Sequence, residues 1–192
     1  HENALADPAA WAARTRAAVR PGSYDVVLTN PPFGARILVR DARILRRYRL
    51  GRVWSRDRRT SAWTPGAAPH PKGVPPQILF LERCLELLRD GGRMGIVLPD
   101  GLLGNPRDGW VRRFLLDRAE ILAVVDVPGE AFQPWTNVKT SVLLLRKGRP
   151  RGPARAIFMG IADACGQDRR GKHVEADDLP SRLPYKHHSG GH

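Results

Sequence analysis

The sequence predicts an α/β fold with a mixed sheet that ends in an antiparallel hairpin, and two observations support this. Short, continuously apolar segments alternate with segments of helical periodicity, which is typical of a sheet covered by helices on both faces. The last two long apolar segments, residues 122–127 and 140–146, are joined only by residues 128–138. A crossover between parallel strands needs about a dozen residues or more, so these strands are expected to be antiparallel neighbours.

The remaining elements follow in chain order. A helix over residues 7–19 has a proline suited to its first turn and ends at a Pro-Gly pair. A β-branched strand over residues 24–29 ends at two consecutive prolines, which remove two backbone donors. A helix over residues 76–89 has leucines at helical spacing and ends at Asp90-Gly91-Gly92. The other predicted elements are strands over 93–98 and 154–159, a helix over 109–117 and a polar tail over 161–192.

The composition is that of a globular protein with an excess of positive charge. Hydrophobic residues make up 42% of the 192 residues and charged residues 27%, which excludes a disordered, collagen-like or disulfide-framework protein. The 32 lysines and arginines against 19 acidic residues give a net charge of +13. This charge favours a polyanionic partner, because arginine pairs with phosphate. A coding bias toward arginine is the alternative, and composition alone does not separate the two.

Cysteine content and hydropathy exclude further classes of protein. Cys84 and Cys165 are too few for a disulfide framework or a four-ligand zinc site, which fits a reducing compartment, and we expect a cytoplasmic protein without a metal site. Cys84 lies among the leucines of the predicted helix and is expected to be buried. No apolar run approaches the roughly 18 residues that cross a bilayer, so no membrane partner is expected.

The tetrapeptide Asn30-Pro31-Pro32-Phe33 directly follows the predicted strand over residues 24–29. In open α/β sheets the reactive groups gather beyond the carboxyl ends of the strands. An Asn, Asp or Ser followed by two prolines and an aromatic residue arises by chance in roughly one chain in a hundred of this length. Its position after a strand makes it a candidate catalytic loop rather than only a turn that ends the strand.

With this motif, the sequence resembles the N6-adenine DNA methyltransferases, and specifically the modification subunit of type I restriction systems. The resemblance runs from about residue 24 to about residue 172 and includes several motifs in order. They are Tyr24–Gly34, Phe80–Leu85, Gly91–Gly101, Phe132–Ser141, Ile157–Met159 and Asp168–Gly171. The resemblance implies a Rossmann-like, S-adenosylmethionine-dependent methyltransferase sheet. It also implies double-stranded DNA and the specificity and restriction subunits of such a system as partners.

The resemblance gives the tetrapeptide and Phe132 their expected roles. The lone pair of adenine N6 is delocalised into the ring, so acceptors must draw the amino group toward a tetrahedral geometry. Asn30 Oδ1 and the carbonyl of Pro31 suit this, and the Pro31-Pro32 turn lowers the entropy cost of fixing them. Phe33 would stack on the adenine once it has left the duplex, a contact of about 1–3 kcal/mol. Phe132 would pack against the other side or the edge of the base.

The resemblance is to the carboxyl-terminal, catalytic half of the family's domain. The family's Gly-rich cofactor loop and its ribose-binding acid lie well before the catalytic strand, but only 23 residues precede Tyr24. Glu2–Leu5 resembles the end of the family's third motif. We therefore expect the amino-terminal cofactor half to be missing, the sheet to have an exposed edge, and S-adenosylmethionine to bind weakly. Asn30 is expected to supply only part of the S-adenosylmethionine site. The expected divisions are 1–23 (partial linker and helix), 24–160 (catalytic half, with an insertion over 36–76) and 161–192 (polar tail).

The insertion over residues 36–76 begins with a strongly basic segment. Residues 36–59 hold ten arginines and two aspartates, an excess of eight positive charges, where the family inserts loops near the DNA. We interpret the segment as a phosphate contact, with a solvated basic face as the alternative. The candidates are Arg36, Arg40, Arg43, Arg46, Arg47, Arg49 and Lys139. Residues 60–76, rich in proline and glycine, are predicted to form a mobile loop.

Two other functions remain open beside adenine methylation. Without a cofactor site, the chain could be an inactive fragment that acts as a basic DNA-binding or subunit-contact module. Alternatively, the same Asn-Pro-Pro-aromatic turn serves related families that methylate RNA adenine or protein glutamine.

Overall fold

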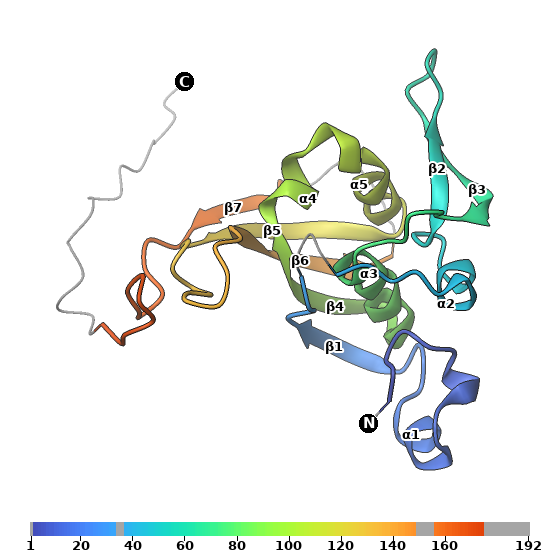
Figure 1. Cartoon of the computed structure of the whole chain (residues 1–192), viewed down its shortest axis with the longest axis horizontal. Coiled ribbons are helices and arrows are strands. Elements are labelled where there is room, and N and C mark those ends of the chain that lie inside the picture. The colour runs from blue at the N-terminus through green and yellow to red at the C-terminus, as the bar shows by residue number, and fades with distance from the viewer. Residues whose placement is uncertain (1, 34–36, 149–155, 175–192) are drawn as a thin grey trace.

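The computed structural model describes residues 2–33, 37–148 and 156–174. Five strands form one mixed sheet in the order β1-β4-β6-β5-β7, and two more form a separate hairpin, β2-β3 (Figure 1). The strands are β1 (Tyr24–Thr29), β2 (Arg52–Arg56), β3 (Trp63–Pro69), β4 (Leu88–Pro99), β5 (Ala119–Val127), β6 (Thr140–Lys147) and β7 (Phe158–Ile161). The α-helices are α1 (Ala13–Ala18), α2 (Ala42–Arg47), α3 (Pro76–Leu87), α4 (Asp100–Gly104) and α5 (Gly109–Leu116), and the 3₁₀ helices are η1 (Pro8–Ala10) and η2 (Pro106–Asp108).

Strand β6 lies between β4 and β5 and runs opposite to both. β1 is parallel to β4, and β7 is parallel to β5. Pro99 at the end of β4 and Val127 at the end of β5 both lie opposite Thr140, the first residue of β6. The predicted antiparallel pair is thus confirmed. The carboxyl ends of β1, β4 and β5 lie at the same end of the sheet, and the loop that joins β5 to β6 lies at this end as well (Figure 1).

The core lies on the face of the sheet that α3, α4 and α5 cover. On this face Met94, Ile96 and Leu98 of β4 and Leu143 and Leu145 of β6 are buried. The buried side chains of the three helices in the same cluster are Ile78, Leu79, Leu81, Cys84, Leu85, Leu102, Val111, Phe114 and Leu115. Continuous burial of these side chains is the main driving force for docking the helices.

The opposite face is open in the part of the chain that the structure describes. Val26 and Leu28 of β1 are 54% and 78% exposed, and Leu144 of β6 is 37% exposed. Leu28 and Leu144 flank Gly95, where a Cβ would lie 2.8 Å from Leu28 Cδ2, so no larger residue fits there unless Leu28 moves. The prediction that helices cover both faces is therefore wrong for these residues, although β1 forms a sheet edge as expected.

The amino-terminal segment does not form the single helix predicted over residues 7–19. It contains η1 and α1, separated at Trp11, whose backbone is extended (ψ 155°). The indole of Trp11 is only 5% exposed, and its Nε1 donates to the carbonyl of Asn3 at 3.0 Å. Burying this side chain requires a turn of the chain that a continuous helix does not provide.

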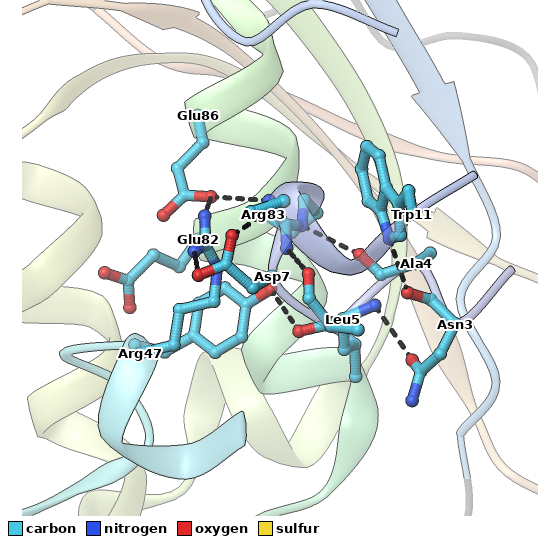
Figure 2. Close-up of polar contacts among 12 residues, drawn as sticks. Asn3, Ala4, Leu5, Asp7, Trp11, Arg47, Glu82, Arg83 and Glu86 are labelled. Atoms are coloured by element: carbon cyan, nitrogen blue, oxygen red, sulfur yellow. Dashed lines mark hydrogen bonds and ion pairs between the residues drawn. The ribbon is translucent and has the colours of Figure 1, made fainter. Parts of the chain in front are cut away.

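A buried guanidinium ties the amino-terminal segment to α3 (Figure 2). Arg83 is 1% exposed, and its Nε and Nη2 donate to the carbonyls of Ala4 and Ala6. Its Nη1 donates to Glu86 at 2.9 Å. The cation also lies 5.3 Å from the ring of Trp11 and 5.4 Å from that of Tyr48, within the range of a cation–π contact.

Two neighbouring side chains extend this network to the segment after α2. The hydroxyl of Tyr48 donates to the carbonyl of Leu5 at 2.9 Å, and burial raises the pKa of this phenol to about 12. Glu82 of α3 accepts from the backbone N–H groups of Arg49 and Leu50 at 3.0 and 2.8 Å. Burial raises the pKa of Glu82 in spite of these bonds. Helix α3 thus holds both residues near the amino terminus and residues 48–50 of the basic insertion.

The loop predicted over residues 60–76 contains a strand, because β3 covers residues 63–69. β3 pairs antiparallel with β2, and Asp57 closes the turn by accepting from the backbone N–H groups of Arg59 and Thr60. The prolines of β3 are tolerated because a two-stranded hairpin has free outer edges, where a missing N–H costs no ladder bond. Trp54 anchors the hairpin by packing 5.9 Å from Trp110 and 6.5 Å from Phe114.

The boundaries of α3 and β4 differ from the prediction. The helix ends at Leu87, and residues 88–92 begin the strand with a register shift against β1. Gly91 has a φ of +78°, so the predicted helix stop acts as an irregularity at the start of β4. Helix α4 was not predicted. β7 begins at Phe158, and residues 154 and 155 lie outside the described residues.

Cys84 is buried in α3 as predicted, and burial raises the pKa of its thiol to about 11. Cys165 is also free. None of the helices in the described residues is both long and apolar enough to cross a bilayer.

We expect Arg83→Met to lower the free energy of unfolding by about 3–5 kcal/mol, because it leaves Glu86 and the carbonyls of Ala4 and Ala6 without their buried donor. Arg83→Lys should recover little of this loss, since an ammonium cannot reproduce the planar fork. Urea denaturation measures both. The matched control is Arg89→Met, which removes an exposed ion pair with Asp25 and should cost less than about 1 kcal/mol. Equal losses in Arg83→Met and Arg89→Met would contradict the role of Arg83.

Candidate active site

The candidate catalytic loop follows β1 directly. Asn30 and Pro32 are exposed, Pro31 is buried and Phe33 is half-buried. The buried ring of Pro31 anchors the turn, while the side chain of Asn30 lies in solvent. In the part of the chain that the structure describes, neither the Asn30 carboxamide nor the Pro31 carbonyl has a hydrogen-bond partner. The exposed Asn30 carboxamide is therefore open to the donor groups of a ligand.

The structure brings Phe33 and Phe132 together, although about a hundred residues separate them. Their ring centroids lie 5.4 Å apart and their planes meet at 85°, an edge-to-face contact. The pair joins the end of β1 to the loop between β5 and β6. Two perpendicular rings beside two free acceptors provide both a stacking surface and hydrogen-bonding groups for a planar amine.

The loop that carries Phe132 is held in one conformation by its own turns and by a later segment. Thr136 N donates to the carbonyl of Phe132 at 3.1 Å. Gln167 Nε2 donates to the carbonyls of Glu130 and Gln133, and Arg169 forms an ion pair with Glu130 at 3.2 Å. A Cβ at Gly171 would lie 2.9 Å from the ring of Pro134, so the two segments are in close contact. We call residues 167–171 the brace.

A cluster of charged groups connects the strand ends at this edge. Lys139 Nζ lies 2.8 Å from Asp126 and 3.8 Å from Asp100, and Ser141 Oγ donates to Asp100 at 2.7 Å. The contact with Asp126 raises the pKa of Lys139. Lys139, a predicted phosphate contact, is thus already paired with two carboxylates. Thr140 Oγ1 and Asp126 Oδ1 are buried without a partner among the described residues.

Among the basic candidates, Arg47 lies at the other end of β1. Glu86, at the end of α3, pairs with Arg47 at 3.4 Å and accepts from Gly22 N just before β1. Asn30 follows the last residue of this six-residue strand, so Arg47 lies about 20 Å away. Figure 1 shows α2 and the β2-β3 hairpin far from the β5–β6 loop.

The candidate phosphate-binding arginines also differ in exposure and in whether a carboxylate already pairs with them. Arg47 is only partly exposed and pairs with Asp7 at 3.2 Å as well as with Glu86, so it has a structural contact. Arg43 pairs with Asp41 on the surface, and Arg40, Arg46 and Arg49 are also exposed. Arg36 lies outside the described residues.

The described residues do not form a complete site for S-adenosylmethionine. No Gly-rich loop precedes a helix among them: Gly91 and Gly92 lie inside β4, and Gly101 and Gly104 lie inside the five-residue helix α4, which follows β4 with no loop between. A cavity of about 280 Å³ beside β1 is lined by Trp11, Val27, Leu28 and other mostly apolar residues, which do not match a charged cofactor. The described residues also contain no cluster of three or more His, Cys, Asp or Glu that could bind a metal.

The sequence missed the brace and the Asp100-Lys139-Asp126 cluster. Both depend on pairing between segments far apart in the chain. The only signal was the resemblance itself, which includes Phe132–Ser141 and Asp168–Gly171 without saying that the brace contacts the loop.

Comparison with known proteins places the chain in a family. The family model described as N-6 DNA Methylase matches residues 1–180. The methylase subunit of the type I restriction enzyme EcoEI from Escherichia coli is 37% identical over 73 residues, which is 38% of this chain and 15% of that protein. The type II methyltransferase M.XhoI from Xanthomonas vasicola is 27% identical over 157 residues, which is 81% of this chain and 26% of that protein. The chain thus spans only a minor part of either relative.

Two solved structures share the fold. A modification subunit assigned to a type I restriction enzyme of Vibrio vulnificus matches 80% of this chain and 29% of its own length, with a TM-score of 0.53 and 21% identity. A protein of Listeria monocytogenes assigned to the class I S-adenosylmethionine-dependent methyltransferases matches 73% of this chain and 37% of its own length, with a TM-score of 0.53 and 18% identity. The predicted methyltransferase sheet is confirmed, and the match over residues 1–180 shows that the chain belongs to the N-6 DNA methylase family.

Proposed function

We propose that the chain binds the adenine in an N6-adenine DNA methyltransferase, within a modification subunit of the type I kind. One observation carries the proposal: in the part of the chain that the structure describes, the Asn30 carboxamide and the Pro31 carbonyl have no hydrogen-bond partner, and they adjoin the Phe33–Phe132 ring pair. The family match and the similarity to the EcoEI methylase subunit support it. The proposed partners are double-stranded DNA and the specificity and restriction subunits. The proposal places the protein with the DNA, in the cytoplasm.

The residues of the site would bind and orient the base rather than remove a proton before the reaction. Asn30 Oδ1 and the Pro31 carbonyl accept the two N6 hydrogens, which draws the lone pair out of conjugation with the ring and directs it away from the acceptors. Phe33 stacks on the base, and Phe132, on the loop between β5 and β6, restricts where the base can lie. S-adenosylmethionine is the proposed methyl donor, and residues beyond those described must complete its site.

The inactive DNA-binding module remains the second candidate. The observation that favours it is the lack of a complete cofactor site among the described residues. The two proposals agree on DNA as the partner and differ in whether methyl transfer occurs.

Asn30→Ala, made in the natural-length protein, should lower the rate of methyl transfer to DNA by about 10²-fold or more, since it removes one positioned hydrogen-bonding group. Asn30→Asp keeps an acceptor oxygen and should retain more activity than the alanine variant. Incorporation of labelled methyl groups measures the rate, and fluorescence anisotropy should show unchanged DNA affinity. Asn105→Ala, which removes only the cap of η2, is the control. Full turnover in Asn30→Ala would reject the role of Asn30.

Replacing Arg43, Arg46 and Arg49 together with glutamine should flatten the salt dependence of DNA affinity. Each lost phosphate contact reduces the slope of log K against log salt by about 0.9. The control variant replaces Arg89, Arg107 and Arg113, which are also exposed, and so changes the net charge equally. Arg47 is left intact because it pairs with Asp7 and Glu86. If both variants keep the wild-type slope, the basic segment is a solvated face and not a phosphate contact.

A further inference from the structure

The loop between β5 and β6 carries an aromatic side chain to which no role has been given. Trp135 is 91% exposed, more than any other large apolar side chain reported as exposed among the described residues. The other four tryptophans, at positions 11, 54, 63 and 110, are buried or half-buried. An exposed indole offers a large planar surface on which a flat, apolar group can stack.

The position of Trp135 is fixed relative to the candidate site. The turn closed by Thr136 N and the Phe132 carbonyl contains it, so the indole follows the Phe132 ring by three residues. Gln167 and Gly171 of the brace contact this loop on both sides of Phe132. These contacts fix the backbone that carries Trp135, so little backbone freedom is lost when a ligand binds, while the exposed indole stays free to turn toward it.

The chemistry around the indole fits a strand of nucleic acid. Trp135 follows a ring that already contacts Phe33 at the end of β1. Two arginines of the brace are exposed to solvent: Arg169 pairs with Glu130 of this loop, and Arg170 follows it in the chain. The cation of Arg170 suits a phosphate backbone. A base beside an extruded nucleotide has lost one stacking neighbour and offers a free π-face.

We propose that Trp135 stacks on the nucleobase next to the adenine that Asn30 and Phe33 hold. This inference rests on the proposed function and adds a second base contact to it. The contact needs no hydrogen bond, so it would accept any base at that position. It would hold the strand on both sides of the target, with Phe33 on the adenine and Trp135 on its neighbour.

The test uses the natural-length protein and a single-stranded 12-mer, five thymines followed by adenine, 2-aminopurine and five thymines. In the wild-type protein, stacking on Trp135 should quench the 2-aminopurine emission upon binding. Trp135→Leu should remove this quenching and weaken binding about 5- to 100-fold, the range that follows from loss of one base–aromatic stack. Trp135→Phe should retain part of the quenching and part of the affinity, because a smaller aromatic ring still stacks.

Two controls separate stacking from other effects. Leu116→Ala removes an exposed apolar side chain at the end of α5 and should change neither signal. Circular dichroism should show the same folded signal for all variants, since Trp135 is exposed.

The outcomes distinguish this inference from the proposed function. If Trp135→Leu keeps both the affinity and the quenching while the wild-type protein methylates DNA, the inference is overturned and the proposed function stands. That result would assign the indole to a protein contact instead. If the wild-type protein neither binds the 12-mer nor methylates DNA, both are overturned.

Discussion

The antiparallel placement of β6 between β4 and β5 determines the geometry of the candidate site. Because β6 runs back along both neighbours, the connection from β5 stays at the edge where β1 and β4 also end. Thr140 pairs with Pro99 on one side and with Val127 on the other, so β4 and β5 end at the same level of the sheet. The loop that leaves β5 therefore returns beside the end of β1, and Phe132 contacts Phe33. A parallel β6 would require a crossover that carries the chain to the opposite edge.

The positive charge of the chain serves several purposes that a net value of +13 does not distinguish. Arg83 is buried and donates to backbone carbonyls, and Arg47 pairs with two carboxylates. Lys139 connects the ends of β4 and β5 through Asp100 and Asp126. The exposed Arg43, Arg46 and Arg49 lie on either side of Arg47 in the chain, and Arg47 lies near the start of β1, about 20 Å from Asn30. A B-form duplex spans that distance within about six base pairs, so the two surfaces could contact one DNA molecule.

Local signals were sufficient to predict much of the fold and the centre of the site. Continuous apolar runs predicted β1, β5 and β6, and the short link predicted that β5 and β6 are antiparallel. The Asn30–Phe33 loop was predictable because two prolines end a strand whatever surrounds it. Phe132 came from the resemblance, since nothing in its local sequence shows that it reaches Phe33.

The features that the sequence did not predict depend on contacts between distant segments. β3 contains Pro65, Gly66 and Pro69, which resemble a loop until β2 supplies a partner. Arg83 has the helical spacing of an ordinary surface cation, and its burial depends on carbonyls almost eighty residues earlier. The open face at Leu28 is equally invisible in a sequence, because the apolar Val26 and Leu28 look the same whether or not a helix covers them.

The central claim is that Asn30, Phe33 and Phe132 together bind an adenine base. Nuclear Overhauser contacts test this most directly, measured between H2 and H8 of an adenine in a bound oligonucleotide and the ring protons of selectively labelled phenylalanines. The account predicts contacts to both Phe33 and Phe132 and a shifted side-chain amide signal for Asn30. Contacts from the bound adenine to other residues only, with Phe33 and Asn30 unchanged, would contradict it.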